Sequence, residues 1–241
     1  ILSMNTLNEY FKKNHKPKTF THKSVEIKQD LETKTIQGKR FYILPDGEKL
    51  PSITTVLSAR GNEGIARWRA SVGEQVANTI MRNAARRGTA VHTLTENYLN
   101  NEELSQQGVL PTALFTILKT ELDKINNIAM QEGALYSEKW GVAGRVDCIA
   151  EYDGKLSVID FKTSTKDKKE EWVENYFIQT TAYCEMFEEQ YGISIDQIVI
   201  LIVTEEGGTQ TFVKNKKDYL PLLKPAIEEF HKKFKENEKT N

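Results

Sequence analysis

The stretch that decides the fold is residues 142–164, Val-Ala-Gly-Arg-Val-Asp-Cys-Ile-Ala-Glu-Tyr-Asp-Gly-Lys-Leu-Ser-Val-Ile-Asp-Phe-Lys-Thr-Ser. Asp153-Gly154 stands between two segments of alternating apolar and polar residues. Asp-Gly in this setting is the strongest short-range signal for a β-hairpin with a two-residue loop. If these two residues form the loop, Tyr152 pairs with Lys155, and the register of the whole hairpin follows.

That register places two acids and a lysine at one site. Asp147 is predicted to lie opposite Asp160, and Arg145 opposite Lys162, with the Asp160 and Lys162 side chains on one face. Directly opposed side chains have Cβ atoms about 4.5–5.5 Å apart, and like charges there destabilise a sheet. A cation between the carboxylates, or a proton on one of them, removes the repulsion.

Oxygen ligands of this kind suit Mg²⁺ or Mn²⁺. A lysine beside the ion can orient a water or stabilise developing negative charge, so the three residues contain the parts needed to hydrolyse a phosphodiester. The alternative is a surface hairpin in which Asp147 pairs with Arg145 or Lys162.

Elements outside the hairpin predict an α/β domain with a helical N-terminal part. Residues 5–37 are Lys-rich and are predicted to form a loose arm or irregular strands. Helices are expected over residues 52–59, 64–86, 90–99, 111–131, 172–191 and 219–235. Strands are expected over residues 40–44, 135–140, 142–152, 155–162, 198–203 and 209–213. We therefore expect an N-terminal arm (1–51), a helical part (52–133) and a core (134–241), in one compact domain overall.

Composition argues against a disulfide-rich, an iron–sulfur or a membrane-spanning protein. The net charge of −1 gives no whole-chain signature of nucleic-acid binding, although basic residues cluster locally. Cys148 and Cys184 are too few for a disulfide framework or an iron–sulfur cluster, which favours a reducing, intracellular setting. No apolar run is long enough to cross a membrane, and no secretory signal is visible.

Several motifs together resemble the PD-(D/E)XK nuclease superfamily. Gly144-Arg145-Val146-Asp147 and Val158-Ile159-Asp160-Phe161-Lys162-Thr163-Ser164 carry the resemblance. The RecB-like branch adds a histidine on an upstream helix, which Arg87-Gly88-Thr89-Ala90-Val91-His92 matches, and a Gln-x-x-x-Tyr pattern, which Gln179 and Tyr183 match.

Within that branch, the chain is similar to the mitochondrial genome maintenance exonucleases and their phage-encoded relatives. This similarity rests on Pro51-Ser52-Ile53-Thr54-Thr55-Val56-Leu57, on Trp68-Arg69 and on residues 147–166, and covers roughly residues 40–215. It implies a restriction-endonuclease-like core, in which a mixed central β-sheet is flanked by helices.

The resemblance also implies roles for individual residues. Asp147, Asp160, His92 and the Phe161 carbonyl would bind one or two Mg²⁺ or Mn²⁺ ions, without an iron–sulfur cluster. Lys162 would be the catalytic lysine, and Glu138 would act through a water-mediated metal contact. Residues expected to contact DNA are Gln179, Tyr183, Thr163, Ser164, Lys166, Arg87, Arg86, Trp68 and Arg69. The competing interpretations are a hydrogen-bonded core histidine for His92, and ordinary helix amphipathicity for Gln179 and Tyr183.

The function implied is a metal-dependent DNA exonuclease of replication, recombination or repair. It would act from a free end on single-stranded DNA or flaps and leave 5′-phosphates. A structure-specific endonuclease and a non-catalytic nucleic-acid-binding module with the same fold are the alternatives. We expect replication or recombination proteins as partners, no membrane, and a bacterial or phage-infected cytoplasm rather than a mitochondrial matrix; oligomeric state stays open.

Overall fold

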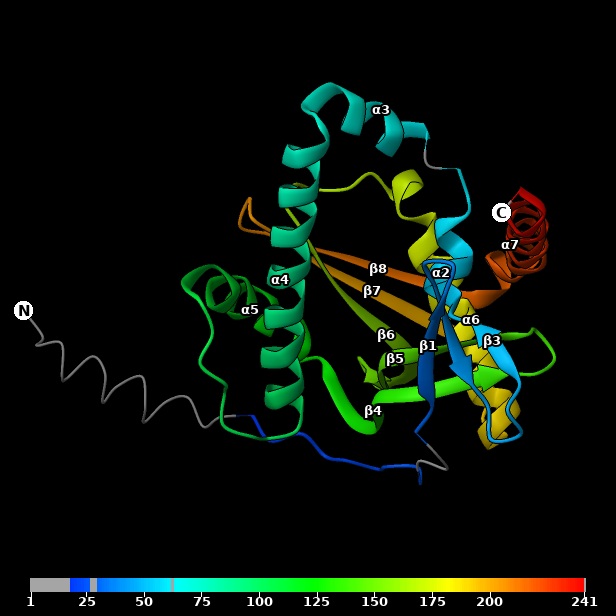
Figure 1. Cartoon of the computed structure of the whole chain (residues 1–241). Coiled ribbons are helices and arrows are strands. Elements are labelled where there is room, and N and C mark those ends of the chain that lie inside the picture. Colours follow the sequence, from blue (N-terminus) through cyan, green and yellow to red (C-terminus); the bar gives the residue numbers. More distant parts are fainter. Residues whose placement is uncertain (1–17, 27–29, 62, 241) are drawn as a thin grey trace, which may run out of the picture.

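A five-stranded mixed sheet forms the centre of the molecule (Figure 1). The computed structural model describes residues 18–26, 30–61 and 63–240, so residues 1–17 and 27–29 of the predicted arm lie outside the described residues. The central sheet has the order β4-β5-β6-β7-β8, with bounds Ile125–Ser137, Val142–Tyr152, Lys155–Ser164, Gln197–Thr204 and Thr209–Asn215. A smaller antiparallel sheet contains β1 (Glu32–Ile36), β2 (Lys39–Ile43) and β3 (Lys49–Pro51).

The β5–β6 hairpin has the predicted loop. Asp153 and Gly154 have φ of 48° and 82°, as a two-residue type I′ turn requires. Predicted pairs run from Tyr152↔Lys155 to Cys148↔Ile159, and the ladder then ends. The prediction that Asp147 pairs with Asp160, and Arg145 with Lys162, was therefore wrong: from Asp160 onward β6 pairs only with β7.

Helices cover both faces of the central sheet. On one face lie α2 (Ile53–Ser58), α6 (Glu174–Tyr191) and α7 (Leu220–Thr240), and on the other α4 (Glu74–Leu99) and α5 (Val109–Leu122). Strand β7, between β6 and β8, is buried along nearly its whole length, with Ile198, Ile200 and Ile202 in one core and Val199, Leu201 and Val203 in the other. A strand buried on both faces is expected to be continuously apolar, as this one is.

The boundary between two of the helices before the central sheet lies at Gly73 and not at Gly88, where it was predicted. Ser52 caps α2 as expected, because its side chain accepts a hydrogen bond from the Thr55 amide. The expected helix 64–86 is interrupted at Gly73, whose φ of 88° ends α3 (Glu63–Val72). Gly88, where a break was expected, lies inside α4. In Figure 1, α3 turns away from the top of α4 and extends toward the side of the molecule that carries α2.

The segment between α5 and β5 was also predicted incorrectly. The expected helix over residues 111–131 ends at Leu122, and β4 begins at Ile125, ten residues before the expected strand. Residues 125–133 pair with β5 around an irregularity between Asn126 and Met130, so tertiary pairing overrides their helical pattern. The expected boundary after residue 133 consequently falls inside β4.

The closing helices and strands agree with the sequence to within a few residues. The expected helix 172–191 is a short 3₁₀ turn, η1 (Glu170–Trp172), followed by α6. Another turn, η2 (Lys216–Asp218), precedes α7. Across the described part of the chain, no helix combines the length and apolarity needed to span a lipid bilayer.

Candidate active site

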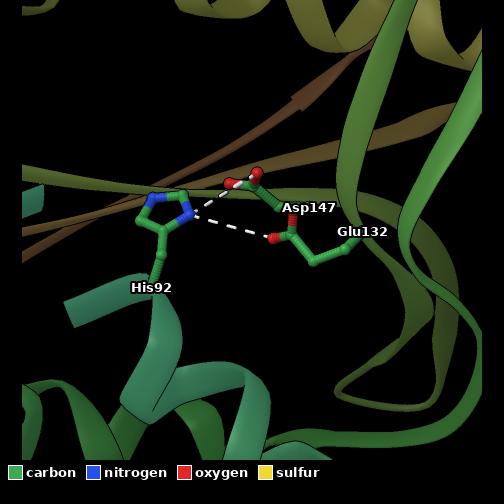
Figure 2. Close-up of side chains that lie close together, drawn as sticks. All are labelled: His92, Glu132 and Asp147. Carbon is green, nitrogen blue, oxygen red and sulfur yellow. Dashed lines mark ion pairs between the residues drawn. The ribbon is translucent and has the colours of Figure 1, made fainter. Parts of the chain in front are cut away.

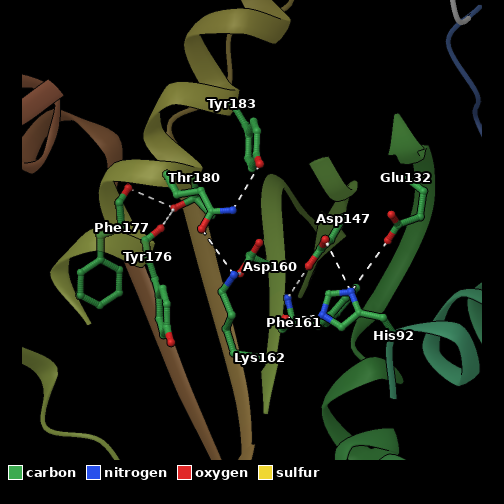
Figure 3. Close-up of polar contacts among 11 residues, drawn as sticks. His92, Glu132, Asp147, Asp160, Phe161, Lys162, Tyr176, Phe177, Thr180 and Tyr183 are labelled. Carbon is green, nitrogen blue, oxygen red and sulfur yellow. Dashed lines mark hydrogen bonds and ion pairs between the residues drawn. The ribbon is translucent and has the colours of Figure 1, made fainter. Parts of the chain in front are cut away.

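The candidate site lies where the β5–β6 ladder opens. After the pair Cys148↔Ile159, the backbones of β5 and β6 are no longer hydrogen-bonded to each other. The backbone groups of Phe161 that face β5 therefore need other partners. Its amide donates to Asp147 Oδ2 at 2.9 Å, and its carbonyl accepts from His92 Nε2 at 2.6 Å. The end of the ladder thus brings β5, β6 and α4 to one point (Figure 3).

His92, Glu132 and Asp147 form the cluster at this point (Figure 2). His92 Nδ1 lies 3.7 Å from Asp147 Oδ1 and 3.9 Å from Glu132 Oε1. Glu132 lies across from Asp147 in the β4–β5 ladder, between the pairs Gln131↔Cys148 and Gly133↔Val146. One ligand atom from each of the three residues lies within 4.8 Å of the others, so they could share an ion.

Glu132 is the member of this cluster that the sequence did not reveal. It falls in the segment taken for the end of a helix, and no motif marks it. Its φ of 47° is the left-handed region that non-glycine residues rarely adopt.

Asp160 and Lys162 lie beside the cluster on the α6 side of β6. Lys162 Nζ is 2.8 Å from Asp160 Oδ2 and 3.4 Å from Gln179 Oε1. It also lies 4.8 Å from the centre of the Tyr176 ring. Gln179 Nε2 donates to Tyr183 Oη at 3.2 Å, so one face of α6 holds the lysine in place (Figure 3).

Gly144 is required here for space. Its φ is not in the left-handed region. A Cβ at this position would lie 2.7 Å from Tyr183 Cε1, 3.1 Å from Tyr183 Oη and 3.3 Å from Ile53 Cγ2. The glycine of Gly144-Arg145-Val146-Asp147 therefore lets the tyrosine of the Gln-x-x-x-Tyr pattern pack directly against β5.

The charged side chains of the site shift each other's pKa values. Burial lowers the pKa of His92, but Asp147, Glu132 and Asp160 outweigh it and raise the value to about 9. Burial and the nearby Asp160 raise the pKa of Asp147 to about 7, against the opposing effect of His92 and Lys162. Burial lowers the pKa of Lys162, but the negative charges of Asp160 and Asp147 outweigh burial and raise the pKa above its usual value. The lysine is therefore positively charged at neutral pH.

The donor set fits a divalent cation. Asp160 is 2% exposed, and its Oδ2 has no hydrogen-bond partner among the described residues apart from the ion pair with Lys162. Crowded carboxylates that raise the pKa of their neighbours gain from a cation between them. Carboxylate and carbonyl oxygens with one imidazole are compatible with Mg²⁺ or Mn²⁺.

Glu138 is not placed in this cluster. It lies exposed in the β4–β5 turn, where its carboxylate gathers with those of Asp46 and Glu48, and its amide donates to Glu189 Oε1. Ser137, the residue before Glu138, pairs with Val142, which lies five positions before Asp147 in β5, or roughly 17 Å of strand. The expected metal contact of Glu138 is thus contradicted, because β4 starts earlier than predicted and brings Glu132 opposite Asp147 instead.

Residues expected to contact DNA fall into three groups. Gln179 and Tyr183 are buried on α6, where Gln179 contacts both Lys162 and Tyr183. Trp68, Arg87, Thr163, Ser164 and Lys166 line one cavity beside the site. Within it, Arg87 donates to Thr163 Oγ1 and pairs with Glu205 at 2.7 Å, while the buried Ser164 hydroxyl donates to the Lys166 carbonyl.

The other two arginines lie outside that cavity. Arg69 is bound within the α3–α4 corner, to Glu74 at 2.5 Å and Asn78 at 3.0 Å. Arg86 is exposed on α4.

This chain is similar in sequence to mitochondrial exonucleases. The human mitochondrial genome maintenance exonuclease 1 is 25% identical over 175 residues, which span 66% of this chain and 50% of that protein. Its mouse counterpart is 38% identical over 73 residues, 30% of this chain and 20% of that protein. The chain thus spans about half the length of the human relative.

A crystallised candidate exonuclease from Eubacterium rectale has a TM-score of 0.42 and 14% identity, covering 61% of this chain and 65% of that one. The sequence pattern of the PD-(D/E)XK nuclease superfamily matches residues 115–239, more than half of the chain. That segment contains Asp147, Asp160 and Lys162 in the geometry described above. The chain belongs to the PD-(D/E)XK nuclease superfamily.

Proposed function

We propose that this protein is a metal-dependent DNA exonuclease that digests single-stranded DNA or flaps from a free end and leaves 5′-phosphates, in replication, recombination or repair. The observation that carries the proposal is the opened hairpin. There the Asp147 carboxylate and the His92 imidazole meet the Phe161 backbone, at 2.9 and 2.6 Å, next to the Asp160–Lys162 pair.

His92, Asp147, Asp160 and the Phe161 carbonyl would hold the ion, and Glu132 supplies the further carboxylate for which Glu138 was expected. Mg²⁺ or Mn²⁺ bound there would polarise the phosphate and acidify a water. Glu132 brings enough negative charge for one ion or two. The imidazole ligand favours Mn²⁺ over Mg²⁺, since magnesium prefers oxygen donors alone.

Lys162 would stabilise negative charge that develops on the scissile phosphate. Its ammonium is positioned by the Asp160 carboxylate and the Gln179 amide oxygen, at 2.8 and 3.4 Å. Preorganised donors of this kind contribute most where charge appears in the transition state and water is excluded. Leaving the phosphate on the 5′ side requires cleavage of the bond to the 3′ oxygen, with Lys162 beside the attacking water.

The α3–α4 corner would select a free end. Trp68 on α3 and Arg87 on α4 line the same cavity as residues just beyond β6, so these helices pass over the end of the catalytic strand. A strand that reaches Lys162 beneath them must be threaded from its end, which closed circles cannot do. The similar mitochondrial exonucleases support this proposal by their names.

The test is a cleavage assay on linear and circular single-stranded DNA with Mn²⁺ or Mg²⁺, using EDTA as the control. We expect metal-dependent loss of the linear strand only, with 5′-phosphorylated products. Lys162→Ala is expected to slow cleavage by about 10²–10³-fold while binding and folding persist. Lys155→Ala, at the exposed start of the same strand, is the matched control and should cleave normally.

Two outcomes would replace the proposal. Cleavage of the circular strand would indicate a structure-specific endonuclease. DNA binding without cleavage at any metal concentration would indicate a non-catalytic binding module. Full activity of the Lys162→Ala variant would overturn the role of the lysine.

A further inference from the structure

We propose that Trp172 and Trp68 form a base-stacking pocket that holds an unpaired nucleotide of single-stranded DNA next to the active site. This inference rests on the proposed function, because it assigns the substrate of that site. It adds Trp172, Tyr176 and Lys168, which no sequence motif marks, to the residues that contact the strand.

Trp172 is exposed to an unusual degree for its size. Its side chain is 64% accessible at the end of η1, and Lys169 Nζ lies 5.1 Å from the centre of its indole. Arg60 holds the turn that follows, through Asn175 at 2.7 Å and Glu174 at 3.1 Å. The indole is therefore presented to solvent from a braced backbone, as a binding residue would be.

Trp172 lines two cavities, and the one that it shares with Trp68 has the composition of a single-strand binding site. Its volume is about 570 Å³, within the range of ligand pockets. Three aromatic side chains line it, those of Trp68, Trp172 and Tyr176, together with three cations, those of Arg87, Lys166 and Lys168. Proteins that bind single strands combine stacking platforms with a positive groove in this way.

One acid, Asp167, also lines the cavity. Thr204 Oγ1 donates to its carboxylate at 3.2 Å, so the side chain already has a partner in the protein. The Lys168 backbone is likewise held, by Gln210 at 2.8 and 2.9 Å. Among the described residues, the Lys166 and Lys168 ammonium groups have no ion-pair partner, so they are available for phosphates.

The cavity adjoins the proposed site of cleavage. Tyr176 lines it and also carries Lys162 Nζ over its ring at 4.8 Å. Cations attract phosphates, so the retained part of the strand would lie in this cavity, against Trp68 and Trp172.

Stacking of this kind selects single strands. A paired base already stacks on its neighbours, whereas an unpaired base can turn out and offer both faces to aromatic rings. Since every base has such a face, the pocket is expected to accept all four bases.

The test measures binding in EDTA, where cleavage is absent, by tryptophan fluorescence. The ligands are an oligothymidylate and an oligomer of the same length with abasic positions throughout. Trp140→Phe removes the indole of the β4–β5 turn, outside the cavity, and serves as background for the other variants. Trp172→Ala is expected to raise the Kd for the oligothymidylate by about 5–150-fold, and Trp172→Phe by less.

The abasic oligomer separates stacking from charge. It should bind more weakly than the oligothymidylate, and Trp172→Ala should weaken it no further, whereas Lys168→Ala should weaken both ligands alike. An unchanged Kd for Trp172→Ala, or an equal loss on both oligomers, would overturn the inference.

The inference and the proposed function fail in different experiments. If the wild type cleaves linear DNA but Trp172→Ala binds it normally, only the stacking pocket is wrong. If stacking is observed but no metal supports cleavage, only the nuclease activity is wrong.

Discussion

Gly144→Ala tests whether the spacing between β5 and α6 sets the position of the catalytic lysine. The new methyl group would lie 2.7 Å from Tyr183 Cε1, so the ring must retreat by about 0.7 Å to reach an ordinary 3.4 Å contact. Tyr183 is 2% exposed and surrounded by core residues, so it has little room to do so. Overpacking of this kind costs about 1–3 kcal/mol.

The displacement would also reach Lys162. Tyr183 Oη bonds Gln179 Nε2 at 3.2 Å, and Gln179 Oε1 is 3.4 Å from Lys162 Nζ, already close to the limit of a hydrogen bond. A misplacement of about 1 Å in a catalytic group can reduce the rate about 100-fold. We therefore expect Gly144→Ala to lower the melting temperature by about 2–12 °C and cleavage by up to about 100-fold.

Gly88→Ala is the matched control for this variant. Its Cβ would meet Thr163 Oγ1 at 3.6 Å, an ordinary contact, from the interior of α4. The change should leave cleavage intact and stabilise the helix by up to about 1 kcal/mol. Tyr183→Phe removes the hydroxyl that bonds Gln179 without overpacking the core. This variant should slow cleavage while its melting temperature stays close to that of the wild type.

Thermal denaturation and single-turnover cleavage decide between the outcomes. If Gly144→Ala melts within 1 °C of wild type and cleaves at the wild-type rate, the close approach to Tyr183 does not position Lys162, and the reasoning is refuted.

Two further predictions concern Glu132 and Lys216. Glu132→Ala should weaken Mn²⁺ binding by about 10–100-fold in a calorimetric titration, whereas Glu138→Ala should leave it unchanged. Glu132→Gly should be about 1 kcal/mol more stable than Glu132→Ala, because glycine accepts a φ of 47°. Equal stability of these two variants would contradict backbone strain at Glu132. Lys216→Met should destabilise the protein by about 1–3 kcal/mol in urea, because the lysine pairs with Glu185 and Glu188 at 3.0 and 3.2 Å. Burial lowers the pKa of Lys216, but these acids outweigh burial and raise the pKa above the usual 10.5. The stability that Lys216 contributes is therefore present below pH 10.5 and is lost as the pH rises through the pKa of the folded state. If the stability difference between the wild type and Lys216→Met does not shrink over that range, the prediction is refuted.

Features with local causes could be predicted from the sequence. The Asp153-Gly154 loop sets its own register through backbone conformations that glycine and aspartate favour, and five ladder pairs follow from it. The Ser52 cap is similarly local, since one hydroxyl satisfies one amide three residues later.

Features that depend on distant partners could not be predicted. Residues 125–133 have the composition of a helix end, and only pairing with β5 makes them a strand. The end of the hairpin ladder is likewise decided from outside, because His92 on α4 and the Asp147 side chain take over the Phe161 backbone groups. The candidate site was therefore predicted in its members on β5, β6, α4 and α6, and missed in its member on β4.

The four residues Gly144-Arg145-Val146-Asp147 each contact a different part of the structure around β5. Gly144 admits Tyr183, Val146 anchors the strand in the core, and Asp147 accepts the Phe161 amide. Arg145 Nη1 donates to the Glu132 carbonyl at 2.5 Å, while Nη2 bonds Asp30. A left-handed residue other than glycine costs about 1–2 kcal/mol, and this arginine bond offsets part of that cost at Glu132. Arg145 thus braces the backbone of Glu132, although the arginine itself is exposed and contacts no other member of the cluster in the described structure.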